Sequence, residues 1–211
     1  MKKTILSLVL LLAFQITLSS ISYASAIYDS FGPNDTYSSS RWALGQTQKM
    51  AIAFTPDGNY IFDSIEFMGS FVFGNPDPTL PNQPAIHLAE GANGPGTILE
   101  SFELLTLTNT PTHFTVTSIL NSLLSAGEQY WVIFDSGNLP ALFAINLNNQ
   151  RYGSPWTDNG DSIWWGPAMS TAPVARVNGT IAPVPEPSTF VLCAIGILGV
   201  GIHHRRKQKN A

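Results

Sequence analysis

The sequence has one cysteine in 211 residues, Cys193, which lies near its C-terminal end. A single cysteine excludes any disulfide within the chain, even in a compartment where disulfides form. Cys193 stands in an uncharged run, where a small apolar side chain is its simplest role. The rest of the chain must fold on a hydrophobic core alone, and residues 27–183 are enough for one domain with a single core.

Basic residues are scarce, with ten Lys and Arg against fourteen Asp and Glu and a formal net charge of −4. Six of the ten lie at the two ends, namely Lys2, Lys3, Arg205, Arg206, Lys207 and Lys209. The chain between them keeps four basic residues against fourteen acids, a difference of −10. This balance argues against nucleic acid as a partner, because binding to phosphates needs clustered Lys and Arg. We interpret the acidic surplus as an aid to solubility.

Catalytic motifs are also missing. The sequence contains neither the zinc-protease helix motif nor the nucleophile elbow of serine hydrolases. His87 and His113 lie in strand-like segments and have no evident partner in the sequence. Glu100 and Glu103 would face opposite sides of a strand, so they do not form the carboxylate pair of a glycosidase. We therefore expect a protein that is not an enzyme, with no catalytic residue and no cofactor.

The first of two long apolar runs has the order of a secretory signal peptide. Two lysines are followed by the uncharged residues 5–18 and then by small residues that include Ala24 and Ala26. A basic start, an apolar segment and a small-residue site in this order direct export and are then removed. We predict that residues 1–26 are a signal peptide, which signal peptidase cleaves after Ala26 or Ala24. The alternative is a retained N-terminal membrane anchor.

The second apolar run, residues 189–202, carries no charge and is followed by Arg205, Arg206 and Lys207. As a helix it would extend about 21 Å, which is shorter than the roughly 30 Å hydrocarbon core of a bilayer. Its three glycines favour a membrane helix, and the basic residues would stay on the cytoplasmic side. We predict a single transmembrane helix over residues 189–202, with the basic tail as the stop-transfer signal.

A proline-containing motif stands directly before this run. It reads VPEPST and consists of Val184, Pro185, Glu186, Pro187, Ser188 and Thr189. The prolines keep the chain extended just outside the predicted helix. The motif, the apolar run and the basic tail, in this order over residues 183–207, resemble the PEP-CTERM sorting signal of Gram-negative bacteria. The resemblance implies that a membrane-embedded exosortase processes the tail of an exported protein, often alongside exopolysaccharide.

Short apolar or alternating segments separated by turn residues fill the middle of the chain. Strands are predicted at residues 47–55, 60–73, 85–90, 97–107, 112–117, 128–135, 141–147, 161–165 and 173–181. Residues 56–59 and 91–96 are typical of turns, residues 75–84 of a proline-rich loop, and residues 118–127 of one short helix. Nine or ten short strands at regular spacing predict an all-β fold for residues 27–183, an antiparallel β-sandwich or jelly roll.

The longest strand-like segment, residues 60–73, alternates in its first half. This alternation predicts that Ile61 and Ile65 share one face and that Phe62 lies on the other. The second half is apolar at nearly every position, so we expect it near the centre of a sheet.

Parts of the middle resemble a second family. The stretches SSRWALGQTQKMAIAFTPDGNYIFDSIEF, IHLAEGANGPGTILESFEL and LSAGEQYWVIFD are similar to blocks of the choice-of-anchor domains. These are exported β-sandwich modules that are attached to varied anchoring tails, PEP-CTERM among them. The resemblance covers about residues 41–135, and it implies a fold and a location rather than an activity.

Aromatic residues cluster in the last third of the domain. Trp156, Trp164 and Trp165 lie close together in sequence, which makes them a candidate platform for stacking on a glycan. The alternative is that these rings pack in the core or cover a hairpin. Asp158 and Asp161 lie between them around Asn-Gly, where a tight hairpin turn is one interpretation and weak calcium ligation is the other.

These features divide the chain into a signal peptide (1–26), an exported domain (27–183) and a sorting signal (184–211). We expect a protein that is anchored in the inner membrane facing the periplasm and that reaches the cell surface or the exterior after processing. Its expected partners are signal peptidase, an exosortase-type enzyme, the membrane and exopolysaccharide. The expected role is non-catalytic, either structural or glycan-binding. A carbohydrate-active enzyme and a calcium-stabilised adhesion module are the alternatives.

Overall fold

The computed structural model describes residues 24–73, 84–103, 109–137, 142–148, 156–158, 163 and 171–183. The chain divides into two compact units, Met1–Ile181 and Ala182–Ala211, and the folded domain belongs to the first. The described part of this domain is all-β with antiparallel pairing, apart from the short 3-10 helix η1 at Pro33–Asp35. The predicted fold class is confirmed at this level.

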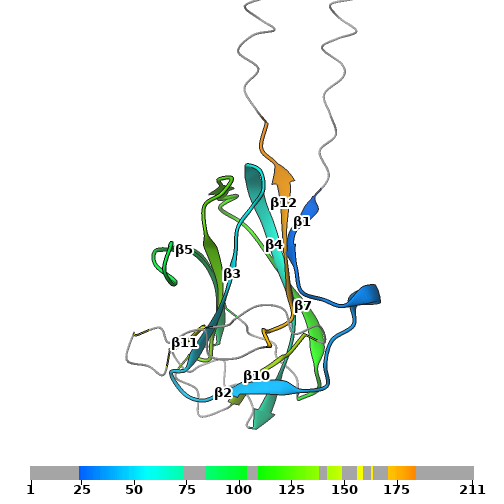
Figure 1. Cartoon of the computed structure of the whole chain (residues 1–211). Coiled ribbons are helices and arrows are strands. Elements are labelled where there is room, and N and C mark those ends of the chain that lie inside the picture. Colours follow the sequence, from blue (N-terminus) through cyan, green and yellow to red (C-terminus); the bar gives the residue numbers. More distant parts are fainter. Residues whose placement is uncertain are drawn as a thin grey trace, which may run out of the picture. The chain divides into compact units, whose positions relative to one another are not determined.

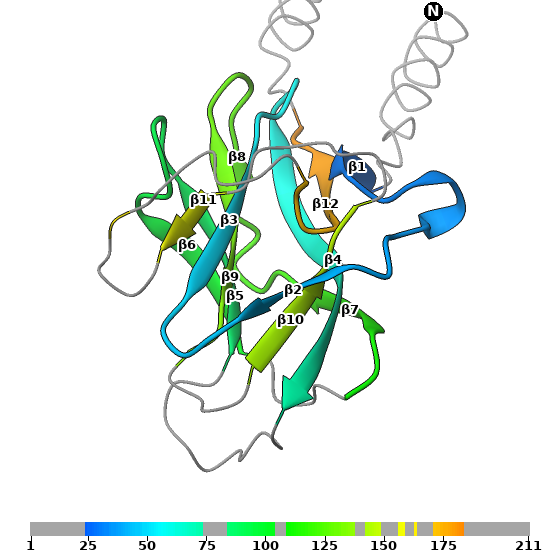
Figure 2. The same cartoon turned by 60° about the horizontal axis from the view of Figure 1, so that its bottom comes forward.

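The strands form two sheets. The seven-stranded sheet contains β1 (Ser25–Asp29), β2 (Arg41–Leu44), β4 (Tyr60–Phe73), β7 (Thr112–Thr117), β8 (Leu123–Leu124), β10 (Leu142–Asn146) and β12 (Ala175–Ile181). The five-stranded sheet has the order β11 (Trp156–Asp158), β3 (Lys49–Phe54), β9 (Tyr130–Asp135), β5 (Ala85–Glu90) and β6 (Ile98–Glu103). The chain passes repeatedly from one sheet to the other, as Figures 1 and 2 show.

One hydrophobic core lies between the two sheets. A single cluster of buried apolar side chains draws its members from both of them. Phe67 of β4 meets Phe134 of β9 edge to face, with 5.7 Å between ring centroids. Phe62 of β4 meets Phe102 of β6 in the same way at 6.2 Å. Two antiparallel sheets that share a core form a sandwich-like arrangement.

The long strand β4 organises the seven-stranded sheet. One edge of β4 pairs with β12 and then with β10, and the other edge pairs with β8 and then with β7. Outside these, β1 pairs with β12 and β2 pairs with β10. The segment after β1 is joined to the segment before β12, since the Ser30 hydroxyl donates to the Pro173 carbonyl at 3.1 Å.

The domain begins and ends at the same end of this sheet. Ser25 in β1 pairs with Gly179 in β12, so the two strands lie side by side where the domain starts and stops (Figure 1). Cleavage of the signal peptide after Ala24 would leave β1 whole. Cleavage after Ala26 would remove two residues that pair with β12.

Most predicted strands are present. Those at residues 60–73, 85–90 and 112–117 have the predicted bounds. Those at 47–55, 97–107, 128–135, 141–147 and 173–181 contain β3, β6, β9, β10 and β12. The sequence did not predict β1, β2, β8 or β11. The predicted strand at 161–165 and the loop at 75–84 lie outside the described residues, apart from Ile163 and Pro84.

The short helix predicted at residues 118–127 is wrong. This segment contains the strand β8 between two irregular turns. Leu124 of β8 is fully buried and pairs with Tyr60 of β4. The backbone N–H groups of Ile119 and Leu120 bond to the carboxylate of Glu100, a residue of the other sheet. The backbone of this segment therefore forms hydrogen bonds with β4 and with the Glu100 carboxylate in place of the bonds of a helix.

The predicted alternation along the start of β4 is also wrong. The register between β4 and β12 shifts at Asp63, and this β-bulge puts Phe62 and Ile65 together in the core. Ile61 therefore does not share the inner face. A Cβ atom on Gly179, opposite the bulge, would lie 2.8 Å from the Ile61 carbonyl oxygen. Such close approach of the two strands requires glycine.

The predicted membrane segments are not part of the described domain. Residues 189–202, the sorting motif at 184–189 and the basic tail lie outside the described residues, as do residues 1–23 of the signal peptide. Among the residues that are described, no helix has the length and the apolar character needed to cross a membrane.

Candidate functional site

Two tryptophans meet on the outer face of the five-stranded sheet. Side chains on this face alternate with those of the core, and Trp131 of β9 is 2% exposed there. Its ring nitrogen donates to the Gly91 carbonyl at 2.6 Å. Trp156 of β11 lies edge to face against Trp131, with 5.5 Å between ring centroids, and stays partly exposed. Trp156 therefore lies outside the main core, at the partly exposed margin of a second, smaller apolar cluster.

Glycine makes room for the Trp156 ring on its other side. Gly94, in the turn between β5 and β6, has a φ of 136°, which side chains rarely allow. A Cβ atom at this position would lie 3.3 Å from the Trp156 ring. The β5–β6 turn and the ring therefore fit together only with a residue that lacks a side chain.

A row of polar side chains crosses the same outer face. The Lys49 ammonium lies 3.0 Å from an oxygen of the Asp135 carboxylate. His87 Nε2 lies 3.5 Å from the same oxygen, and His87 Nδ1 lies 2.8 Å from the Ser101 hydroxyl. We call Lys49, Asp135, His87 and Ser101 the polar row. Its members come from four adjacent strands, β3, β9, β5 and β6.

The neighbours of Asp135 favour the charged form of its carboxyl group. Burial alone would raise the pKa of this carboxyl group. Hydrogen bonds from His87, from the Gly137 N–H and from Lys49 outweigh burial and hold the pKa below its ordinary value. Asp135 therefore remains charged at neutral pH, and its partners stabilise the charged form.

We predict that Asp135→Asn lowers stability at neutral pH and that the difference from the wild type shrinks in acid. A carboxyl group whose pKa is lowered by folding contributes stability above its unfolded pKa of about 3.9, and this contribution is lost as the pH falls through the folded pKa. Urea unfolding of both proteins at about pH 7 and about pH 3 measures the effect. A gap that is equal at both values would contradict the assignment.

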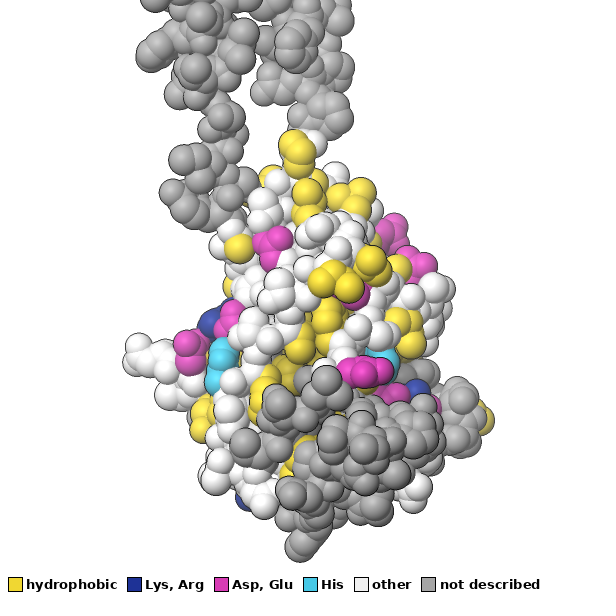
Figure 3. All heavy atoms as spheres, turned by 180° about the vertical axis from the view of Figure 1, so that it is seen from behind, with side chains coloured by type: hydrophobic (Ala, Val, Ile, Leu, Met, Phe, Trp, Pro, Cys, Tyr) yellow, Lys and Arg dark blue, Asp and Glu magenta, His cyan; other side chains and the backbone are white. Residues whose placement is uncertain are grey.

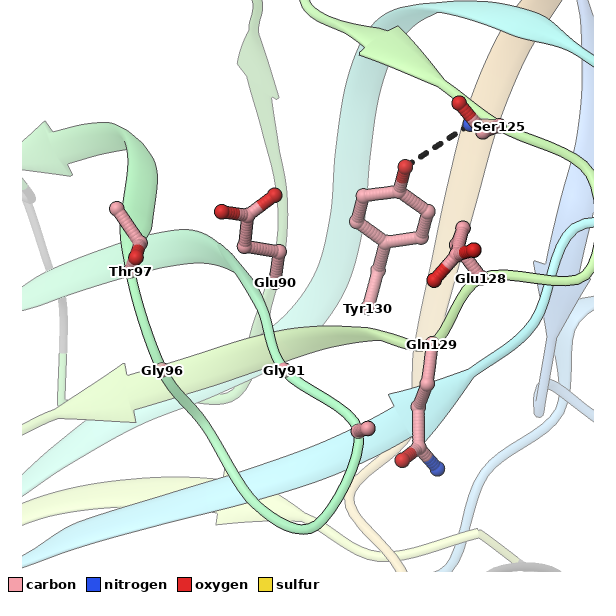
Figure 4. Close-up of a pocket in the computed structure, with 9 residues that line it drawn as sticks. Glu90, Gly91, Gly96, Thr97, Ser125, Glu128, Gln129 and Tyr130 are labelled. Atoms are coloured by element: carbon pink, nitrogen blue, oxygen red, sulfur yellow. Dashed lines mark hydrogen bonds between the residues drawn. The ribbon is translucent and has the colours of Figure 1, made fainter.

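A polar pocket lies at one end of the five-stranded sheet. It has a volume of about 420 Å³ and is formed by the β5–β6 turn and the loop that leads into β9. Glu90 and Glu128 flank the Tyr130 ring, whose hydroxyl accepts a hydrogen bond from the Ser125 N–H at 2.9 Å (Figure 4). None of the nine described residues that line the pocket is basic. Such a lining suits hydroxyl groups or cations better than anions.

Arg176 connects several elements on the outer face of the seven-stranded sheet. Its guanidinium lies 2.8 Å from Asp29, 2.6 Å from Asp35 and 3.3 Å from Glu66. It also lies over the Phe31 ring, 5.2 Å from the centroid. Desolvation alone would lower the pKa of Arg176. Hydrogen bonds with Asp35 and Asp29 outweigh this effect, so the pKa lies above its ordinary value. All three carboxylates are engaged by one arginine, so this cluster joins β1, β4, β12 and η1 rather than offering ligand groups.

The second histidine belongs to the same face. His113 Nε2 lies 3.3 Å from the Glu66 carboxylate, and its ring lies 5.7 Å from that of Phe31. Both histidines therefore lie on strands, as predicted, but each has a carboxylate partner that the sequence did not reveal. Strand alternation places these groups on the outer faces, but it does not identify which strands are neighbours.

The remaining predicted site residues have separate outcomes. Asp158 lies at the end of β11, paired in register with Lys49, and is 3% exposed. Trp164, Trp165 and Asp161 lie outside the described residues, so calcium ligation and the full tryptophan platform remain predictions. Within the part of the chain that the structure describes, no group of three or more His, Cys, Asp or Glu side chains is arranged to hold a metal ion.

Comparison with known protein families concerns the C-terminal end of the chain. Residues 183–207 match the PEP-CTERM protein-sorting motif. No curated protein matches the chain. The match confirms the sorting signal that the sequence predicts, and it begins two residues after β12 ends. The chain therefore carries a PEP-CTERM sorting motif, the mark of an exported protein that an exosortase-type enzyme sorts at the membrane.

Proposed function

We propose that the protein is a non-catalytic component of the cell envelope or extracellular matrix that binds exopolysaccharide. The observation that carries this proposal is the outer face of the five-stranded sheet. Partly exposed Trp156 and the polar row lie there together. An aromatic ring supplies a stacking surface for a sugar, and charged and hydroxyl groups supply hydrogen-bond partners for sugar hydroxyls.

The dimensions of this face suit an extended chain of sugars. The polar row spans four adjacent strands, which is about 14 Å at 4.7–4.9 Å per strand. Trp156 is in register with Ala51, two residues from Lys49 along β3, so the ring lies within about 7 Å of the row along the strand. A polysaccharide can contact both groups at once.

The sorting signal explains how such a domain reaches its place. The apolar run at 189–202 would halt export and hold the domain in the inner membrane, facing the periplasm, until an exosortase cuts near Pro185-Glu186-Pro187. The domain ends at Ile181, so removal of the tail would leave every described strand in place. Processing would then pass an intact domain to the cell surface or the exterior.

We predict that Trp156→Ala reduces retention of the domain on exopolysaccharide from its native host. Trp156 packs on Trp131 outside the main core, so the melting temperature should fall much less than it does when a core aromatic residue is removed, which costs roughly 3–5 kcal/mol. Trp156→Phe keeps a stacking ring and should restore most of the retention. A pull-down with the soluble domain measures retention, and thermal unfolding measures stability. Unchanged retention in Trp156→Ala would exclude this ring from the binding face.

A carbohydrate-active enzyme is the second candidate, and the polar row favours it. The Ser101 hydroxyl contacts one ring nitrogen of His87, and the Asp135 carboxylate lies beside the other. A hydroxyl, a histidine and a carboxylate in this order can make the hydroxyl group a nucleophile. Incubation with the same polysaccharide separates the two functions. Retention without fragments indicates binding. Acyl groups released from the polysaccharide, or shorter chains, indicate catalysis if they disappear in His87→Ala, because a hydroxyl group activated by a histidine attacks ester carbonyls.

A further inference from the structure

Exposed aliphatic side chains gather at the end of the domain where β12 stops. Of the seven strongly exposed large apolar side chains among the described residues, five lie at this end. We call these five the apolar tip: Ile98, Ile119, Leu120, Leu123 and Ile181. Hydrophobic side chains are visible toward the upper end of the domain in Figure 3.

Strand pairing fixes the position of the apolar tip. Ile181 of β12 and Leu124 of β8 pair with the same residue, Tyr60, from opposite edges of β4. Leu123 and Ile181 are therefore about two strand spacings apart, roughly 10 Å. Ile98 begins β6 just after the β5–β6 turn, which lies at the same end of the other sheet.

The loop that carries Ile119 and Leu120 is held in place. The Glu100 carboxylate, which is buried, accepts hydrogen bonds from the Ser118 hydroxyl and the Ile119 N–H, both at 2.7 Å. It accepts a third from the Leu120 N–H at 3.2 Å. The loop nevertheless leaves the Ile119 side chain 82% exposed and the Leu120 side chain 62% exposed. A loop fixed by a buried carboxylate thus directs aliphatic side chains into the solvent.

The length of the linker brings a lipid surface within reach of the apolar tip. Seven residues, 182–188, separate Ile181 from the apolar run that begins at residue 189. Even when fully extended, they span at most about 25 Å. If the run crosses the membrane, as the proposed function holds, the end of the domain that carries the apolar tip remains near the bilayer.

We propose that the apolar tip inserts into the interfacial region of the inner-membrane bilayer while the tail is uncut. The tip contains no charged residue, and Glu90 and Glu128 lie close by, so the contact depends on apolar burial rather than on attraction to anionic lipid. Insertion orients the domain and holds Pro185-Glu186-Pro187 at the membrane surface. This inference rests on the proposed anchoring by residues 189–202.

The contact also depends on the tether. A single myristoyl chain gives only marginal and reversible membrane binding, and five partly exposed side chains are an apolar anchor of the same order. The tail keeps the tip at a high effective concentration beside the bilayer. Removal of the tail by the processing enzyme therefore releases the domain.

The test places a fluorescent probe at either end of the domain in the chain without its signal peptide, residues 25–211, so that β1 is whole and residues 189–202 are the one long apolar run. Cys193→Ala removes the native thiol, and an environment-sensitive dye is attached to Leu120→Cys or, as the control, to Asn109→Cys. Asn109 is exposed and lies near the start of β7, away from the Tyr60 end of β4. The labelled chain is reconstituted in vesicles of phosphatidylethanolamine and phosphatidylglycerol that contain brominated lipid.

We expect the lipid to quench the dye at position 120 several-fold more than the dye at position 109, and we expect this quenching to be insensitive to salt. A labelled chain of residues 25–183, which lacks both apolar runs, should show no difference between the positions. Loss of the chain 25–211 from vesicles in a carbonate wash would overturn the proposed anchoring by residues 189–202. If the chain stays on the vesicles but the dye is quenched equally at both positions, the anchoring stands and the insertion of the apolar tip is overturned. Shielding of position 120 without lipid quenching, growing with protein density, would assign the tip to a second copy and also overturn the inference.

Discussion

Changing Pro185, Glu186 and Pro187 together to alanine is expected to leave an uncut protein in the inner membrane. The wild type should lose a few kilodaltons at its C-terminus and leave that membrane. The substitution removes the extended peptide that a processing enzyme would bind, while the apolar run and the basic tail remain. Immunoblots of membrane, periplasmic and external fractions from the native host measure the change, with an antibody against the domain.

Deletion of residues 189–211 is the matched control. Without the apolar run the domain has no anchor, so it should appear uncut in the periplasm. Processing and sorting of the triple-alanine protein like the wild type would reduce the Pro-Glu-Pro stretch to a linker. The chain would then be an ordinary single-span membrane protein.

The sequence predicted strands best where the two faces of a segment differ or are both apolar. Residues 60–73, 85–90 and 112–117 were predicted with correct bounds because turn residues or prolines separate them from their neighbours. β1 and β2 were missed. Each has four or five residues with mixed polarity, and each is held by pairing with a strand about 100 residues or more away in the sequence.

Errors within the fold have long-range causes. Residues 118–127 have apolar positions that suit a helix, but Glu100 on another strand binds the N–H groups that a helix would use. Phe62 faces the core, contrary to the prediction, because a β-bulge shifts the register of β4 opposite Gly179, a residue far away in sequence. Neither feature has a local signal, since each depends on which strands become neighbours.

The candidate binding face was predicted only in part. Trp156 was recognised from the tryptophan cluster, but its contact with Trp131 brings together β11 and β9, which are joined only through β3. His87 was given no partner, because Ser101 and Asp135 come from the strands on either side of it. Alternation could have placed all three side chains on one face. The order of strands in the sheet was the missing information.

Glu100→Ala is expected to destabilise the domain strongly. Glu100 is 3% exposed and accepts three hydrogen bonds from residues 118–120, which connect β7 to β8. Its removal leaves the Ser118 hydroxyl and two backbone N–H groups without their acceptor. A hydrogen bond to a charged group contributes about 1.5–3 kcal/mol, so the loss of three such bonds is expected to cost about 3 kcal/mol or more. For a domain of this size, a loss of about 3 kcal/mol in unfolding free energy corresponds to a fall of roughly 6–12 °C in melting temperature.

Glu103→Ala is the control, because Glu103 lies on the same strand and its side chain is exposed. It should change stability by less than about 0.5 kcal/mol, as surface substitutions usually do. Glu100→Gln should fall between the two, since its amide oxygen can still accept hydrogen bonds from the loop while its amino group cannot. Melting temperatures of the three variants and the wild type decide the matter. Equal values for Glu100→Ala and Glu103→Ala would mean that the buried carboxylate does not hold the loop, and that the exposure of Ile119 and Leu120 has another cause.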